Sequence, residues 1–168
     1  MPLHIVLCEP EIPQNTGNIS RTCAAIGAHL HLIEPMGFKI NDAQVKRAGL
    51  DYWQHLKLSI HSTLTGFQNT MDHEGRTWYL STKAAKSYAE VNFGSANEDC
   101  FIMFGKETAG LPLSLLERHS DHTLRIPMLK HIRSLNLSNA VAILAYEVMK
   151  QWDFPDLETQ GLLAQKHQ

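Results

Sequence analysis

The 168-residue sequence contains no apolar run of about 18 residues, which is the length that a membrane-spanning helix requires. Its first residues, MPLHIVLCEPE, lack both the basic segment and the long apolar segment of a signal peptide. This stretch predicts a first strand instead. We therefore expect a cytoplasmic protein that does not contact a membrane.

Cysteine is scarce, with only Cys8, Cys23 and Cys100 in the whole chain. An odd number of widely spaced cysteines in apolar surroundings does not fit a disulfide framework and favours reduced, buried thiols. Strong charge is also missing, since the net charge is −2 at pH 7. This balance excludes a protein that binds nucleic acid through bulk positive charge, so any RNA contact has to come from local basic groups.

Common signatures of nucleotide, metal and hydrolase sites are absent. No G-x-G-x-x-G occurs, and the Gly-Lys of FGKETAGLP lacks the upstream glycine and the following Ser or Thr of a P-loop. No G-x-S-x-G elbow is present. Ten histidines raise the question of a metal site, but no H-E-x-x-H, C-x-x-C or H-x-x-x-H pattern appears. His29 and His31 share a strand face, which alone is too weak a signal, so we expect no metal.

Short apolar runs alternate with helical patterns along the chain. We expect strands at 3–8, 30–33, 56–60, 76–81, 100–104 and 123–126, and helices at 18–26, 42–48, 63–71, 112–118 and 138–152. Asn18 is the expected N-cap of the first helix and Gly27 its C-terminal stop. This alternation predicts an α/β fold, a parallel sheet with helices on both faces. Residues 1–153 form the single expected domain and 154–168 a polar C-terminal tail.

The last expected helix is apolar on nearly all sides. One face carries Leu137, Val141, Leu144, Ala145 and Val148, and Ala140, Ile143 and Met149 cover much of the rest. A helix of this kind has to be covered from two sides. In a chain this short, a second subunit is the natural second cover, so we expect a homodimer through the C-terminal helix.

Three loops follow expected strands, where ligands of open α/β sheets bind. EPEIPQNTGNISR places Arg21 near a helix N-terminus that favours an anion, although a solvent-exposed arginine is the alternative. FIMFGKETAGLP offers backbone groups that can bind the edges of a purine and a ribose. SLNLSN, residues 134–139, contains more polar groups than a helix cap requires. This surplus indicates a concave polar site, with an over-capped helix as the alternative.

Taken together, NTGNISR, FGKETAGLP and RIPM…SLNLSNAVAILAYE resemble the three ordered motifs of the SPOUT superfamily of RNA methyltransferases, and within it the ribose 2′-O-methyltransferases. EPEIPQNTGN, EPMGF at 34–38 and RAGLDYW at 47–53 are similar to the small enzymes that methylate cytidine or uridine 34 of tRNA. The resemblance covers about residues 3–152. At 129–132, LKHI is more basic and apolar than the family pattern, which bears on how the substrate is held.

The resemblance implies an α/β sheet with a C-terminal trefoil knot, a homodimer, and S-adenosylmethionine as methyl donor, with S-adenosylhomocysteine as product. It implies cofactor contacts at Leu80, Gly105, Ile126, Met128, Ser134, Leu135 and Asn139. Arg21 matches the catalytic arginine of the family. Because a guanidinium hardly deprotonates in proteins, we expect it to orient a phosphate and stabilise the developing alkoxide rather than act as a base. Asn15 is expected to orient Arg21 or the ribose.

The implied RNA partner is the anticodon loop of tRNA, held by basic side chains of a dimer. The expected RNA contacts are Lys46, Arg47, Arg125, Lys130 and Arg133. Tyr146 is expected to contact the nucleotide, although packing in the core is an equal alternative. Three other functions remain open: a 2′-O-methyltransferase of ribosomal RNA, a non-catalytic RNA-binding module of the same fold, and a flavodoxin-like carrier.

Overall fold

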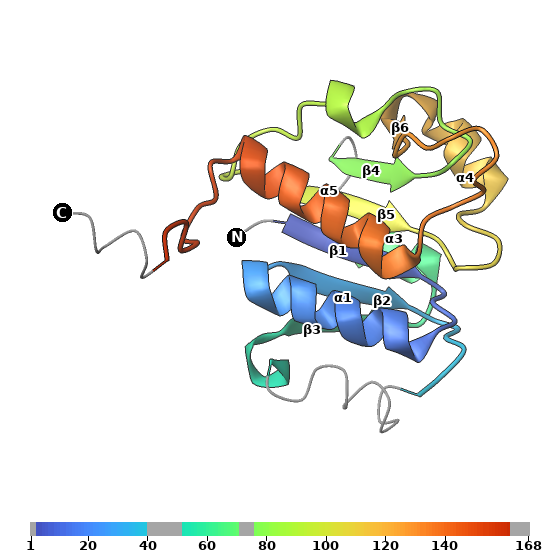
Figure 1. The fold of residues 1–168 in the computed structure, drawn as a ribbon. Helices are drawn as coiled ribbons and strands as arrows, with labels where there is room; N and C mark the ends of the chain where they lie inside the picture. The colour runs from blue at the N-terminus through green and yellow to red at the C-terminus, as the bar shows by residue number, and fades with distance from the viewer. Residues whose placement is uncertain (1–2, 40–51, 71–75, 162–168) are drawn as a thin grey trace.

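The computed structural model describes residues 3–39, 52–70 and 76–161 (Figure 1). The expected helix at 42–48, together with Lys46 and Arg47, lies outside the described residues. No described helix is both long and apolar enough to cross a membrane.

The sheet contains six strands, all parallel, in the order β3-β2-β1-β5-β4-β6. The strands are β1 (Leu3–Cys8), β2 (His29–Ile33), β3 (Lys57–His61), β4 (Thr77–Leu80), β5 (Cys100–Phe104) and β6 (Thr123–Leu124). Every residue of β1 and β5 is buried, as expected for central strands covered on both faces. The six expected strands are confirmed, with ends that shift by up to two residues.

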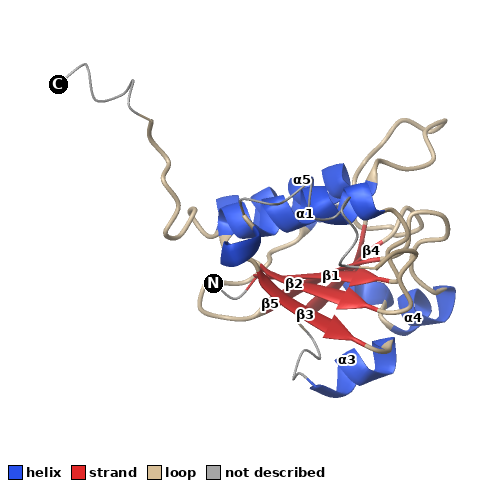
Figure 2. Ribbon diagram, turned by 90° about the horizontal axis from the view of Figure 1, so that it is seen from below, coloured by secondary structure: helices blue, strands red, loops and turns tan. Residues whose placement is uncertain are grey.

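Four α-helices are described, and they cover both faces of the sheet as predicted. They are α1 (Pro13–Ile26), α3 (Leu64–Thr70), α4 (Leu113–Arg118) and α5 (Leu137–Gln151). Helices α1 and α5 lie side by side on one face, and α3 and α4 lie on the other (Figure 2). Short 3-10 helices, Trp53–His55, Tyr88–Glu90 and Ser120–His122, lie in the connections. Each face has its own hydrophobic cluster, so the sheet separates two cores.

The start of α1 differs from the prediction. The helix begins at Pro13, and Asn18 lies inside it, so the predicted cap at Asn18 is wrong. Ile12 occupies the cap position without any side-chain hydrogen bond of its own. Proline fits the first helical position because its fixed φ suits the helix and its missing N–H is not needed there. At the other end the prediction is confirmed, since Gly27 ends the helix with φ of 68°.

The cysteines and the C-terminal segment bear on two further predictions. Cys8, Cys23 and Cys100 are free and buried, as expected, and burial raises the pKa of the Cys23 thiol to about 12. After α5, the indole N–H of Trp152 donates to the Gly94 carbonyl at 3.0 Å. The expected tail begins with side chains that pack on the core, at Phe154 and Leu157.

Candidate functional site

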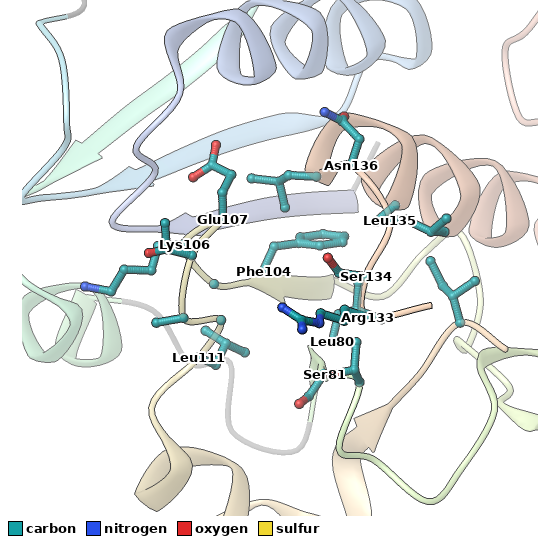
Figure 3. A pocket seen from close by; sticks show the side chains of 18 of the residues that line it. Leu80, Ser81, Phe104, Lys106, Glu107, Leu111, Arg133, Ser134, Leu135 and Asn136 are labelled. Atoms are coloured by element: carbon teal, nitrogen blue, oxygen red, sulfur yellow. The ribbon is translucent and has the colours of Figure 1, made fainter. Parts of the chain in front are cut away.

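A cavity of about 540 Å³ opens at the carboxyl ends of β4 and β5 (Figure 3). Three segments far apart in the sequence form its walls: the end of β4, the loop after β5, and the chain between β6 and α5. The lining residues are Ile12, Asn15, Leu80–Lys83, Phe104–Leu111, Ile126, Met128, Arg133–Leu137 and Ala140. These segments include two of the three loops that the sequence singled out, and Asn15 comes from the third.

Most of the expected cofactor residues line this cavity. Leu80, Gly105, Ile126, Met128, Ser134 and Leu135 all belong to its wall. Asn139 does not line it, and its backbone N–H points to the Asn136 side chain at 3.4 Å. The sequence motifs therefore located the cavity, while Asn139 is not part of its wall although Leu137 and Ala140 are.

Gly105 and Gly110 shape the wall formed by the loop after β5. A Cβ atom on Gly105 would overlap the backbone of Gly110 and Leu111. Gly110 has φ of 70°, a conformation that favours glycine, and its N–H donates to the Lys106 carbonyl at 2.8 Å. The loop can fold back on itself only because both positions lack a side chain, which leaves backbone groups at the cavity surface.

Glu107 joins this loop to the start of α1. Its carboxylate accepts hydrogen bonds from the Glu11 N–H at 2.8 Å and the Ile12 N–H at 3.2 Å. It also accepts one from Asn15 Nδ2 at 3.0 Å. A negative charge beside a helix N-terminus is stabilised by the helix dipole and satisfies N–H groups that have no partner in the helix. Glu107 therefore supplies the cap that Ile12 cannot.

Asn15 extends this network to α5. The Asn15 side chain is 4% exposed, and its Oδ1 accepts from Asn136 Nδ2 at 3.0 Å. Asn136 in turn caps α5, because its Oδ1 accepts from the Ser138 N–H at 2.9 Å and from the Ser138 hydroxyl at 2.6 Å. Glu107, Asn15 and Asn136 thus form one line of hydrogen bonds that connects all three loops.

Two more contacts hold the loop after β5 against the loop after β1. Lys106 Nζ lies 2.7 Å from Glu9 Oε2, and this partner raises the pKa of the lysine. The Glu11 carboxylate accepts from the N–H of Thr108 at 3.0 Å and from its hydroxyl at 2.7 Å, which lowers the pKa of Glu11. The sequence analysis missed Glu107, Glu9 and Glu11, because their partners are more than ninety residues away.

Arg21 lies outside the cavity on α1 and is exposed. Its Nη2 donates to the Tyr52 hydroxyl at 3.1 Å, and its guanidinium carbon lies 4.7 Å from the centre of the Tyr52 ring. Tyr52 was not among the expected site residues, although it belongs to the RAGLDYW motif. Tyr146 is 48% exposed on α5, so the alternative that placed it in the core of the chain is wrong.

The structure describes three of the expected RNA contacts, Arg125, Lys130 and Arg133, and one of them lines the cavity. Arg133 lines the cavity, and its side chain extends into the cavity in Figure 3. Lys130 is exposed in the chain between β6 and α5. The backbone of Arg125 pairs with Lys86 and Tyr88, which fixes its position beside the 3-10 helix at Tyr88–Glu90. Besides Arg133, the charged residues of the cavity wall are Lys83, Lys106 and Glu107.

Comparison with known proteins adds independent findings. Residues 2–146 match the SpoU rRNA Methylase family. A candidate tRNA (cytidine(34)-2′-O)-methyltransferase of Listeria monocytogenes is 53% identical over 155 residues, which are 92% of this chain and 90% of the relative. The tRNA (cytidine(34)-2′-O)-methyltransferase of Saccharophagus degradans is 47% identical over 152 residues, 90% of this chain and 96% of the relative.

Solved structures of methyltransferases are also similar to this chain. One that is described as giving insights into the 2-OH methylation of C/U34 on tRNA is 45% identical, with a TM-score of 0.83 over 89% of this chain and 95% of that chain. The AviRb methyltransferase of Streptomyces viridochromogenes, solved in complex with AdoMet, has a TM-score of 0.76 at 21% identity, over 88% of this chain and 57% of that chain. The second comparison bears on the fold alone.

Proposed function

The chain belongs to the SpoU methylase family, and on this premise we propose that it transfers a methyl group from S-adenosylmethionine to the ribose 2′-OH of nucleotide 34, a cytidine or uridine, in tRNA. The main structural support for the proposal is the line of hydrogen bonds that connects the three loops. Glu107, Asn15 and Asn136 hold the cavity and the arginine-bearing helix α1 in one arrangement. Relatives with the same reaction in their names are similar over nearly the whole chain.

The cavity fits S-adenosylmethionine in size and chemistry. Its volume of about 540 Å³ lies within the usual range of small-molecule sites. Leu80, Ile126 and Leu135 offer apolar surface for the adenine, and the loop at Gly105 offers backbone groups for its edge. Ser134 adds a hydroxyl to the same wall. The remaining proposed contacts are Met128, in the wall, and Asn139. When bound, the cofactor supplies a methyl group on a sulfonium, which makes that methyl an electrophile.

Arg21 is the proposed catalytic arginine. The reaction needs the 2′-OH to lose its proton while negative charge develops on its oxygen, and a fixed cation nearby stabilises that charge. The guanidinium stays protonated, so its role is to orient the adjacent phosphate and to stabilise the alkoxide. Asn15 positions this helix relative to the cavity, and positioning of two reactants alone can contribute about 7 kcal/mol or more to catalysis.

Basic side chains are the proposed RNA contacts, and an apolar surface on α5 is the proposed dimer interface. Lys46, Arg47, Arg125, Lys130 and Arg133 are the proposed contacts to the anticodon loop. Helix α5 leaves Ile143 and Tyr146 exposed, and Ile12 is exposed at the start of the neighbouring α1. A second copy of the chain would cover this apolar surface and place Tyr146 near the nucleotide. We infer a cytoplasmic homodimer, with no metal ion in the methyl transfer. Family membership also implies the C-terminal trefoil knot.

The deciding experiment is nucleoside mass spectrometry of tRNA from cells that lack this activity, incubated with the protein and S-adenosylmethionine. New 2′-O-methylcytidine or 2′-O-methyluridine at position 34 is the expected result. Methylation of ribosomal RNA in place of tRNA would reject the substrate and keep the reaction. Cofactor binding without any methylated RNA product would support the alternative of a non-catalytic RNA-binding module.

Variants of Arg21 test the catalytic assignment. Arg21→Ala should lower kcat at least about 100-fold, the usual cost of removing a group that stabilises developing charge. Arg21→Lys should recover little of this loss, because an ammonium cannot match the planar geometry of a guanidinium. Arg76→Ala is the matched control, since Arg76 is exposed and lies at the amino end of β4, whereas the cavity opens at its carboxyl end. Near-normal activity of Arg21→Lys would argue against a specific guanidinium role.

A further inference from the structure

Three histidines gather on the sheet face that α3 covers, away from the cavity. His29 and His31 alternate along β2 and therefore share a face, and the β1–β2 register pairs His4 with His29. One ring nitrogen of each of the three residues lies within 4.8 Å of the others. We propose that His4, His29 and His31 form a binding site for a divalent transition-metal ion, with zinc as its preferred occupant.

The distances between the rings are close to those that a metal ion requires. His4 Nδ1 and His31 Nε2 face each other at 2.9 Å, and the two ring centres are 5.2 Å apart. Two nitrogens that bind one tetrahedral zinc at about 2.0–2.1 Å are roughly 3.4 Å apart. The pair therefore has to open by only about half an ångström. The His29 ring centre is 4.1 Å from that of His31, and one nitrogen of His29 lies within 4.8 Å of the other two ligand atoms.

The outer partners of a metal site are already in place. Histidines that bind metals nearly always hydrogen-bond through their second ring nitrogen, which fixes the orientation of the ring. His4 Nε2 lies 3.5 Å from the Asp99 carboxylate, and His29 Nε2 lies 2.9 Å from the Ser59 hydroxyl. For His31, the second nitrogen lies 3.1 Å from His61 Nε2. Each of the three rings thus has one nitrogen beside an outer partner.

The hydrogen bonds between the rings also suit a metal, because neutral imidazole is the form that binds metals. With the Asp99 carboxylate as the last acceptor, three rings form a chain of Nε2–H donors, from His61 through His31 to His4. A metal between His4 and His31 takes the place of one shared hydrogen. His31 and His61 then change tautomer, and no proton is released.

Aromatic side chains fix the positions of the histidine rings, and the type of ligand limits which metal ions can bind. The Phe101 ring stacks on His4 with centres 4.2 Å apart, and the Phe67 ring meets His31 edge-on at 5.5 Å. His31 is 1% exposed, while His29 is half-buried and leaves a way in from solvent. A set of neutral imidazoles suits zinc, copper or nickel rather than magnesium or calcium, and three histidines leave a fourth position for a water molecule.

This site does not depend on the proposed methyl transfer. Sequence spacing did not predict it, because the ligands lie on two strands and only the sheet register brings His4 beside the His29–His31 pair. The cluster lies on the face of α3, whereas the cavity opens at the carboxyl ends of β4 and β5. A chelator should therefore remove the metal and leave methyl transfer measurable, so each proposal can fail without the other.

The test uses the full-length chain without a polyhistidine tag, treated with a chelator and titrated with zinc against a competing indicator dye. One zinc ion per chain is the expected stoichiometry. X-ray absorption at the zinc edge should show a first shell of nitrogen and oxygen at about 2.0–2.1 Å with imidazole scattering beyond it. A sulfur shell at about 2.3 Å would place the ion on a cysteine and overturn the proposal.

Variants assign the ligands. Ser59→Ala removes only an outer partner and should weaken zinc binding about tenfold. His29→Gln removes a ligand at a half-buried position and should weaken it further, with the fold checked by circular dichroism. His55→Gln, a histidine exposed in the 3-10 helix Trp53–His55, is the control and should bind zinc normally. Equal zinc affinity in His29→Gln and the unmodified chain would overturn the proposal, and so would a stoichiometry far below one.

Discussion

The guanidinium of Arg21 lies over the ring of Tyr52 and donates a hydrogen bond to its hydroxyl at 3.1 Å. The two residues are 31 positions apart, and the pair fixes an arginine that is otherwise exposed on α1. A cation over an aromatic ring contributes about 0.5–1 kcal/mol at an exposed site, and a hydrogen bond contributes a similar amount. Tyr52 thus limits the orientations that the proposed catalytic group can adopt.

Tyr52→Phe removes the hydroxyl and keeps the ring, so we expect kcat to fall by about two- to tenfold. Tyr52→Ala also removes the ring, and its loss should be larger. Because Tyr52 acts through Arg21, the double variant Tyr52→Ala with Arg21→Ala should be no slower than Arg21→Ala alone. Transfer of a labelled methyl group to tRNA measures all three, and losses that simply multiply would contradict this coupling.

Glu107→Gln tests the link between the cavity and α1. The variant keeps one acceptor oxygen but loses the negative charge beside the helix N-terminus and one of the accepting atoms. Hydrogen bonds to a charged group contribute about 1.5–3 kcal/mol each, so we expect the free energy of unfolding to drop by at least about 1 kcal/mol. Urea denaturation measures the drop, and Glu117→Gln, on the exposed surface of α4, is the control. An unchanged midpoint would show that the carboxylate does not cap α1.

Gly105→Ala should close the cavity. The added Cβ would overlap the backbone of Gly110 and Leu111, and backbone cannot move aside as a flexible side chain can. We expect S-adenosylmethionine binding, measured by calorimetry, to weaken at least about tenfold, together with a lower Tm. Gly161→Ala is the matched control, because a Cβ there meets nothing within 4 Å. Tight binding by Gly105→Ala would place the cofactor elsewhere.

Stability should depend on pH through His4, His29 and His61. Burial is the largest cause that lowers the pKa of His4, His29 and His61 below 6.5; Asp99 opposes it at His4, and Lys57 adds to it at His29. The unfolded chain therefore binds protons more strongly, so this stability is present above pH 6.5 and is lost as the pH falls.

Urea midpoints measured between pH 7.5 and 5.5 in the presence of a chelator check this expectation, because most carboxylates titrate below that window. The midpoint should fall toward pH 5.5. In His29→Gln the fall should be smaller, since one of the three groups no longer titrates. A midpoint that rises toward pH 5.5 would mean that Asp99 outweighs the burial of the cluster.

Local sequence patterns predicted most of the fold but not the start of α1. Strand β5 reads as five apolar residues and is buried throughout, because burial on both faces leaves a direct mark on composition. The first turn of α1 leaves no such mark. Its cap is the Glu107 carboxylate, more than ninety residues away, so rules that search for a capping residue beside the helix chose Asn18 instead.

The candidate site shows the same limit. Gly105, Ile126 and Ser134 were located because each belongs to a motif that resembles those of the SPOUT methyltransferases, and all three line the cavity. Tyr52 and Asn136 act through partners that only the folded chain brings near, on α1 in both cases. Pairwise contacts of this kind leave no trace in the local pattern of either residue, so the sequence identifies the loops but not the bonds between them.

The strand order has a consequence for how the chain is made on the ribosome. β1 pairs with β2 on one side and with β5 on the other, and the partner residues Leu3 and Cys100 are almost a hundred positions apart. Once His61 has emerged, β1, β2 and β3 can pair, but the other edge of β1 stays bare and apolar until Phe104 follows. A bare edge of this kind readily pairs with other chains, and such distant pairings form slowly. While the ribosome synthesises the segment between His61 and Phe104, this edge of β1 has no partner strand. During that time the nascent chain depends on chaperones or on dilution to avoid aggregation.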